Sequence, residues 1–161
     1  TSGSKVSCRL IGDANWDYGA FTSSEKNPAY GDDFIGITWS GSFSTSNSSC
    51  TATDSLGNSI STRMVDSIAN GGRVWAFREY LPEDHVINYA TNIHPIMNIT
   101  KNTMTGNGNT AEAVMKYIHT YQQTVGSISM SAGSETVSAG FTLNSVEKQW
   151  SLVCTVTGIP Y

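Results

Sequence analysis

Apolar and polar residues alternate in several short segments of this 161-residue chain. The clearest such segment is Val146–Val156, in which every second position from 150 onward is apolar. Its apolar positions are Trp150, Leu152, Cys154 and Val156, and the intervening positions are Ser151, Val153 and Thr155. A period of two residues is typical of a β-strand with one buried face. We therefore expect the first three apolar positions to point into the core, with Ser151 and Thr155 facing outward.

Similar patterns predict strands along much of the chain. They cover Lys5–Ile11, Phe34–Trp39, Ser59–Ile68, Arg73–Tyr80, one or two segments of His85–Ile99 interrupted by Pro95, and Val137–Leu143. Turn signals separate them, among them LGN at 56–58 and NGG at 70–72. The segment GSFSTSNSS at 41–49 is low in complexity, and we expect it to be flexible. Short strands with a turn about every ten residues are typical of an antiparallel β-sandwich.

Residues 110–122 fit two kinds of secondary structure. Asn109 and Glu112 form a capping-box pattern, and apolar residues follow at helical spacing. The same segment also fits a strand, because Met115, Tyr117 and His119 would share one face. The surrounding β context and the tyrosines favour a strand. We expect an all-β chain, with one short helix near residues 110–122 as the alternative.

Composition and charge narrow the classes of partner. Only 14% of the residues are charged, and the formal net charge is −4. Because no run of Lys or Arg occurs, we expect neither nucleic acid nor anionic membrane as a partner. No apolar run reaches the length of a membrane span, so membrane insertion is not expected either. The low charge and the many Ser, Thr, Asn and Gly residues suit a secreted β protein.

The three cysteines are Cys8, Cys50 and Cys154. In a secreted chain one pair would form a disulfide and one thiol would remain. We expect the pair Cys8–Cys50, since each lies beside a strand-like segment. The alternative is three reduced thiols in a cytosolic protein. Cys154 lies in an alternating apolar strand, which favours a buried, inert thiol over a nucleophile.

The sequence contains no recognised motif of a catalytic or cofactor-binding site. No GxSxG, HExxH or Walker pattern is present. The histidines His85, His94 and His119 match no compact metal motif, although they would form a metal site if the fold brought them together. We therefore expect no enzyme activity and no cofactor, with a small secreted metal-binding protein as an alternative.

The chain resembles subunits of bacterial chaperone–usher fimbriae. Two features carry the resemblance: the spacing of the first two cysteines, and a later set of residues similar to the closing strands of such pilins. That set is Gly108, Asn109, Thr110, Lys116, Tyr117, Thr120, Thr124, Gly126 and Phe141. The chain departs from shaft subunits in having only seven residues before Cys8, an additional strand after Leu143, and a third cysteine. In length and early cysteine pair it is more similar to the N-terminal lectin domains of two-domain tip adhesins.

This resemblance implies an immunoglobulin-like or jelly-roll antiparallel sandwich without catalytic activity. It would form a receptor-binding domain over residues 1–158, with 159–161 beginning a linker or ending the domain. Its expected place is the cell surface, at the tip of a fimbria, with other fimbrial subunits joined through a following domain. Its expected partner is a host glycan or glycoprotein. The alternative is a structural subunit of a pilus or of a phage surface.

Candidate ligand-binding residues lie in stretches that look like loops. Sugar sites use aromatic faces against C–H surfaces, while carboxylates and amides bond the hydroxyl groups. The candidates are Trp16, Asp17, Tyr18, Tyr30, Asp32, Asp33, Asp84 and His85. Trp16 and Asp33 are the best pair, because one offers an exposed aromatic face and the other a hydrogen-bond acceptor.

Overall fold

Every element in the described part of the chain is a β-strand. The computed structural model describes residues 4–16, 30–80, 90–103, 108–120, 127–130, 140–144, 146 and 149–161, and no helix occurs within these ranges. The ambiguous segment forms strand β9 (Thr110–Thr120), so the strand prediction is confirmed. Neighbouring strands pair with both sides of β9, and this context outweighs its local helix signal.

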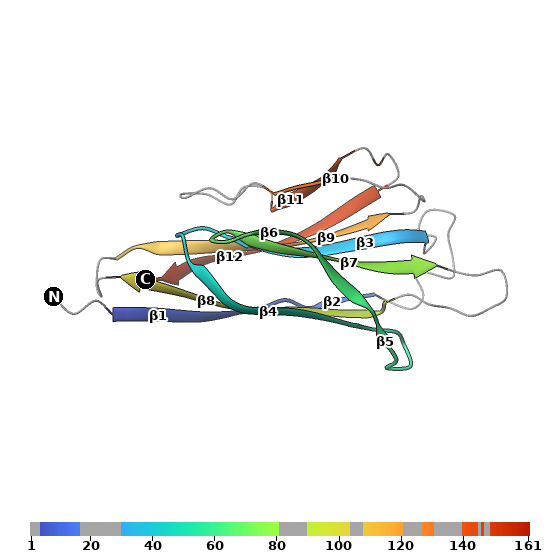
Figure 1. The fold of residues 1–161 in the computed structure, drawn as a ribbon, viewed down its shortest axis with the longest axis horizontal. Helices are drawn as coiled ribbons and strands as arrows, with labels where there is room; N and C mark the ends of the chain where they lie inside the picture. Colours follow the sequence, from blue (N-terminus) through green and yellow to red (C-terminus); the bar gives the residue numbers. More distant parts are fainter. Residues whose placement is uncertain are drawn as a thin grey trace.

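Two five-stranded antiparallel sheets form the sandwich (Figure 1). Sheet A has the order β1 (Ser4–Ile11), β8 (Asn92–Thr103), β4 (Ser44–Thr53) and β5 (Ser59–Ile60), and β2 (Ala14–Asn15) also pairs with β8. Sheet B has the order β12 (Gln149–Pro160), β9, β3 (Tyr30–Trp39), β7 (Gly72–Tyr80) and β6 (Thr62–Ile68). The predicted all-β antiparallel sandwich is confirmed.

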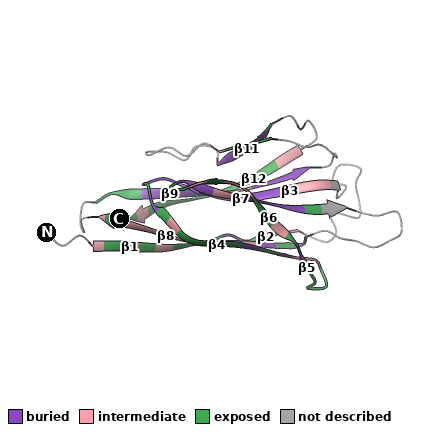
Figure 2. Cartoon of the chain, viewed as in Figure 1, coloured by how far each residue is buried: buried purple, intermediate pink, exposed green. Residues whose placement is uncertain are grey.

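The main core fills the space between the two sheets (Figure 2). Its largest fully buried side chains include Trp39, Phe43 and Phe77. A smaller core lies on the outer face of sheet B, where the hairpin of β10 (Ser127–Met130) and β11 (Phe141–Asn144) covers it. The alternation predicted up to Leu143 is confirmed in β11, since Phe141 and Leu143 are buried and Thr142 is exposed.

Gly36 in β3 allows this hairpin to approach sheet B. A Cβ atom at Gly36 would lie 2.9 Å from the ring of Phe141, from a methyl group of Val74 and from the carbonyl of Arg73. Such distances are too short for non-bonded carbon atoms, so any larger side chain would displace the hairpin.

Pro95 lies inside β8 and does not interrupt it. The Gly12 N–H donates to the Pro95 carbonyl at 2.9 Å, at the point between the end of β1 and the start of β2. Because the N–H and C=O of one residue point to the same side of a strand, the N–H that proline lacks would face this break. The predicted interruption is therefore wrong.

One further prediction, that of a flexible segment, is also wrong. Most of the segment predicted to be flexible, 41–49, belongs to β4, where pairing with β8 satisfies the backbone. Residues 159–161 belong to the sandwich. Ile159 and Tyr161 pack against the main core, and the Tyr161 N–H donates to the Asn109 carbonyl at 3.0 Å.

The predicted Cys8–Cys50 disulfide is absent, and all three thiols are free. Cys8 lies in β1 opposite Ile99, and Cys50 lies in β4 opposite Pro95, so strand β8 separates them. Two strand spacings amount to about 10 Å, whereas a disulfide needs Cα atoms within about 7 Å. This pairing is therefore wrong for the fold observed.

Candidate functional site

One cross-strand row on the inner face of sheet B organises the site. Trp150 of β12 lies opposite His119 of β9, and Phe77 of β7 lies opposite Asp33 of β3. The pairing of β3 with β9 begins one residue later, at Phe34 and Ile118, so Asp33 and His119 are neighbours at its end. Asp33 and His119 are both fully buried. The row therefore places a carboxylate and an imidazole between two aromatic side chains.

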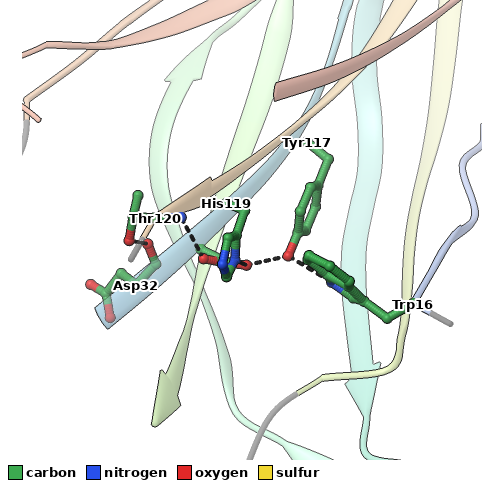
Figure 3. Close-up of polar contacts among 6 residues, drawn as sticks. Trp16, Asp32, Tyr117, His119 and Thr120 are labelled. Carbon is green, nitrogen blue, oxygen red and sulfur yellow. Dashed lines mark hydrogen bonds and ion pairs between the residues drawn. The ribbon is translucent and has the colours of Figure 1, made fainter. Parts of the chain in front are cut away.

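Asp33 accepts three hydrogen bonds from residues of β9, namely Tyr117, His119 and Thr120, which are labelled in Figure 3. The Tyr117 hydroxyl donates to Oδ2, which also lies 2.8 Å from Nδ1 of His119. The Thr120 N–H donates to Oδ1 at 2.9 Å. Trp16 extends the network, because its Nε1–H donates to the Tyr117 hydroxyl at 2.9 Å. The network thus connects a side chain of the β2 end to the centre of sheet B.

The burial of Asp33 and His119 limits the role of this network. A buried carboxylate is stable only when its oxygens are hydrogen-bonded or paired with a positive charge, and Asp33 has such partners. Because neither Asp33 nor His119 is accessible, they position other side chains and do not contact a ligand directly. The prediction that Asp33 lies in an exposed loop is wrong, since it lies inside β3.

Trp16 is half-buried and lies against other aromatic rings. Its backbone N–H donates to the Thr91 carbonyl at 2.8 Å, which continues the pairing of β2 beyond Asn15. Its ring meets Tyr117, His119 and Trp150 edge-on, with centroids 5.9, 5.1 and 5.2 Å apart. The prediction of an exposed aromatic face at Trp16 is wrong, because the side chain is half-buried. We expect Trp16 to contribute to stability as well as to any contact surface.

An open cleft of about 340 Å³ lies beside Trp16, between the β2 end of sheet A and strand β12 of sheet B. Aromatic side chains of Trp16, Tyr117 and Trp150 form part of its lining. Asp13 and Asn15 line it from the side of sheet A, and both are exposed. Leu152 and Cys154 line it from the side of β12. We call this the aromatic cleft.

A second hollow of about 460 Å³ continues the aromatic cleft along the same side of the sandwich. Both hollows share Asp13, Met115 and Cys154 in their linings. The second is bounded by β1 and by the later part of β12, including Val156 and Ile159. The side of the sandwich between β1 and β12 is therefore an open groove with a mainly apolar lining.

This groove explains why the orientation predicted for β12 is only partly correct. Leu152, Cys154 and Val156 share the face that lines it, as the alternation indicates. Leu152 is nevertheless 64% exposed and Val156 56% exposed. Among the four apolar positions 150, 152, 154 and 156, only Trp150, which lies beside Trp16, is half-buried. The prediction that Leu152 and Cys154 are buried in the core is wrong, because β12 is an edge strand beside an open groove.

The remaining candidate residues do not join this site. The Asp32 carboxylate forms an ion pair with Arg63 at 2.5 Å. Asp17, Tyr18, Asp84 and His85 lie outside the described residues, as does the side chain of Tyr30.

The histidines in the described part of the chain have separate partners. His94 lies 2.5 Å from Asp13 on an exposed surface, whereas His119 is buried beside Asp33. Among the described residues no group of three or more His, Cys, Asp or Glu side chains could hold a metal ion. Burial raises the pKa of the Cys50 thiol to about 12, so this cysteine is an unreactive core residue.

Sequence reasoning missed Tyr117, Trp150, Asp13 and Asn15 as parts of one site. Alternation had placed Trp150 on an inner face and Tyr117 on the same face as His119. No signal connected them to Trp16, because hydrogen bonds such as Trp16–Tyr117 join residues far apart in the sequence.

The described residues contain no helix long and apolar enough to cross a membrane. Comparison of the chain with protein-family models, with curated proteins and with solved structures found no match.

Proposed function

We propose that this chain is the receptor-binding domain of a non-catalytic adhesin at the cell surface, and that the aromatic cleft binds a host glycan or glycoprotein. One observation carries the proposal. Two half-buried tryptophans, Trp16 and Trp150, lie with exposed Asp13 and Asn15 around an open cleft of about 340 Å³. Clefts of this size with an apolar lining and a few polar groups are typical ligand sites.

The residues suit a sugar ring in chemical terms. Tryptophan rings offer apolar surface to C–H groups, and the Asn15 amide both donates and accepts hydrogen bonds. The Asp13 carboxylate accepts bonds from hydroxyl groups while His94 holds it in place. The buried network fixes Trp16 through Tyr117, so binding would lose little conformational entropy at the aromatic wall.

The place of this domain in a fimbria rests on the sequence resemblance. The low content of charged residues, 14%, supports export. A following domain would supply the contacts with other fimbrial subunits.

Glycan-array screening of the full chain, followed by titration of the best ligand, tests the proposal. Asn15→Ala should weaken binding about tenfold, as expected for the loss of one or two hydrogen bonds. Its thermal midpoint should stay unchanged, because Asn15 is exposed.

Asn102→Ala is the matched control, since Asn102 is also exposed but lies in β8 opposite Lys5, outside the cleft. Equal losses in both variants, or no binding to any glycan or glycoprotein tested, would reject the aromatic cleft as a receptor site.

A further inference from the structure

Strand β12 presents an unprotected edge. It is 12 residues long and pairs with β9 on one side, and no strand of the described residues pairs with its other side. Residues 151–158 are all exposed (Figure 2). Leu152, Val153 and Val156 are among the most exposed large apolar side chains of the described residues. The outer backbone N–H and C=O groups of such a strand are available for pairing with another strand.

Charge distinguishes β12 from β1 and β6, the other edge strands of more than two residues in the two large sheets. Natural edges are usually protected by charged side chains, as β1 is by Lys5 and Arg9 and β6 by Arg63 and Asp66. Between Gln149 and Pro160 there is no Asp, Glu, Lys, Arg or His. When two copies of one strand pair about a two-fold axis, identical side chains come close together. Charged side chains on the strand would then repel each other, whereas β12 has no charged side chain to cause such repulsion.

We propose that β12 is a self-association edge, at which two copies of this chain pair antiparallel about a two-fold axis at Cys154. In this register Leu152 lies opposite Val156 of the second copy, and Val156 lies opposite Leu152 of the second copy. These residues share one face, so the pairing forms a continuous apolar stripe with the two Cys154 side chains at its centre. A register centred on Val153 would instead set Ser151 opposite Thr155.

The regular part of β12 accommodates this register. The pairing with β9 is continuous from Gln149 to Val156 and shifts only between Val156 and Ile159. The proposed contact uses residues 152–156 of each copy and ends before this irregularity. The second copy would therefore extend sheet B and lengthen the wall of the groove beside the aromatic cleft.

Cys154 is placed to lock the pair covalently. Side chains directly opposite in an antiparallel pair have Cβ atoms about 4.5–5.5 Å apart, and a small adjustment brings them to the 3.5–4.5 Å of a disulfide. One Cys154 thiolate attacks a low-molecular-weight disulfide such as oxidised glutathione, and one glutathione thiolate leaves. The second Cys154 thiolate then displaces the other glutathione, so that one protein disulfide and two reduced glutathiones result.

The test compares the oligomeric state of the full chain and of lysine variants by sedimentation equilibrium under reducing conditions. The parent should dimerise reversibly. Leu152→Lys and Val156→Lys, at the two ends of the apolar stripe, should each weaken dimerisation about tenfold or more. Leu56→Lys is the matched control, because Leu56 is 85% exposed but lies in the turn after β4. Circular dichroism establishes that each variant is folded.

Oxidation tests the register. With oxidised glutathione the parent should form a covalent dimer joined through Cys154, whereas Cys154→Ser should form only the reversible dimer. A parent chain that stays monomeric at all concentrations overturns the proposal. So does a loss of dimerisation in Leu56→Lys equal to that in both β12 variants, or a covalent dimer joined through Cys8.

Discussion

Tyr117→Phe provides the sharpest test of the buried network, because it removes a single oxygen atom from the centre of the site. The Tyr117 hydroxyl donates to the Asp33 carboxylate and accepts from Nε1 of Trp16. The phenylalanine ring would keep the aromatic contacts with Trp16, Phe77 and Trp150, whose centroids lie 5.9, 6.2 and 6.0 Å away. The packing contribution is therefore the same in the parent and in Tyr117→Phe, and the difference in the free energy of unfolding measures the lost hydrogen bonds.

The magnitude follows from the charge and burial of the partner. A hydrogen bond to a charged group contributes about 1.5–3 kcal/mol, and Asp33 is too deeply buried for water to replace the lost donor. The Trp16 N–H adds little, because Trp16 is half-buried and water can replace its acceptor. We expect the free energy of unfolding to fall by about 2 kcal/mol. In a chain of this size, the thermal midpoint would fall by about 4–8 °C.

The assay is urea unfolding followed in parallel by tryptophan fluorescence and far-UV circular dichroism. Tyr161→Phe is the matched control, since its ring would keep the contact with Nζ of Lys101, which lies 3.9 Å from the Tyr161 centroid. The control should change stability by less than about 0.5 kcal/mol. A similarly small change in Tyr117→Phe would refute the reasoning, because the hydroxyl would then have no net role in holding Asp33.

Four further predictions follow from individual contacts. Gly36→Ala should lower the free energy of unfolding by about 1–3 kcal/mol in urea titrations, because the added methyl group meets Phe141; an unchanged value would show that β11 moves away easily. Leu152→Ala should cost less than about 0.5 kcal/mol in the same assay at protein concentrations at which the chain is monomeric, because its side chain is 64% exposed; a larger loss there would mean that the groove closes in solution. Cys154 should react with a thiol reagent in the folded protein at pH 8, whereas Cys50 should not, since burial raises its pKa to about 12; peptide mapping after labelling separates the two outcomes. Asn58→Ala should raise the pKa of Asp54 toward its ordinary value in an NMR titration, because the Asn58 side chain holds that pKa down; an unchanged pKa would assign the effect to the backbone donors of the turn.

Strand positions were largely predictable because alternation is a local property. The segments around β1, β3, β7, β11 and β12 were all identified from it. The failures at β4 and Pro95 have a common physical cause. In both places the pairing with β8 decides the outcome. Strand β8 supplies backbone partners to the Ser-rich segment that forms β4. The break between β1 and β2 lies where Pro95 lacks an N–H donor.

The buried network could not be predicted from local pattern. Two adjacent acidic residues after a glycine, Asp32 and Asp33, look like a solvated loop. Strand alternation places them on opposite faces, and only Asp33 reaches the interior. Its partner Tyr117 lies 84 positions away in the sequence, and His119 lies 86 positions away. Since one unpaired buried carboxylate is costly, the location of Asp33 was fixed by residues that no local signal connects to it.

Strand β12 shows where alternation stops being sufficient. Trp150 and Leu152 occupy equivalent positions on one face of the same strand, yet Trp150 is half-buried and Leu152 is 64% exposed. The difference arises from Trp16, whose ring lies 5.2 Å from that of Trp150 and covers it. Alternation states which side chains share a face, whereas burial depends on what lies across from that face. The charge pattern carries complementary information, because charged side chains are one means by which natural edge strands avoid pairing with another chain, and β12 has none. Since the described residues supply no covering strand, the charge-free edge of β12 is the feature on which the proposed self-association rests.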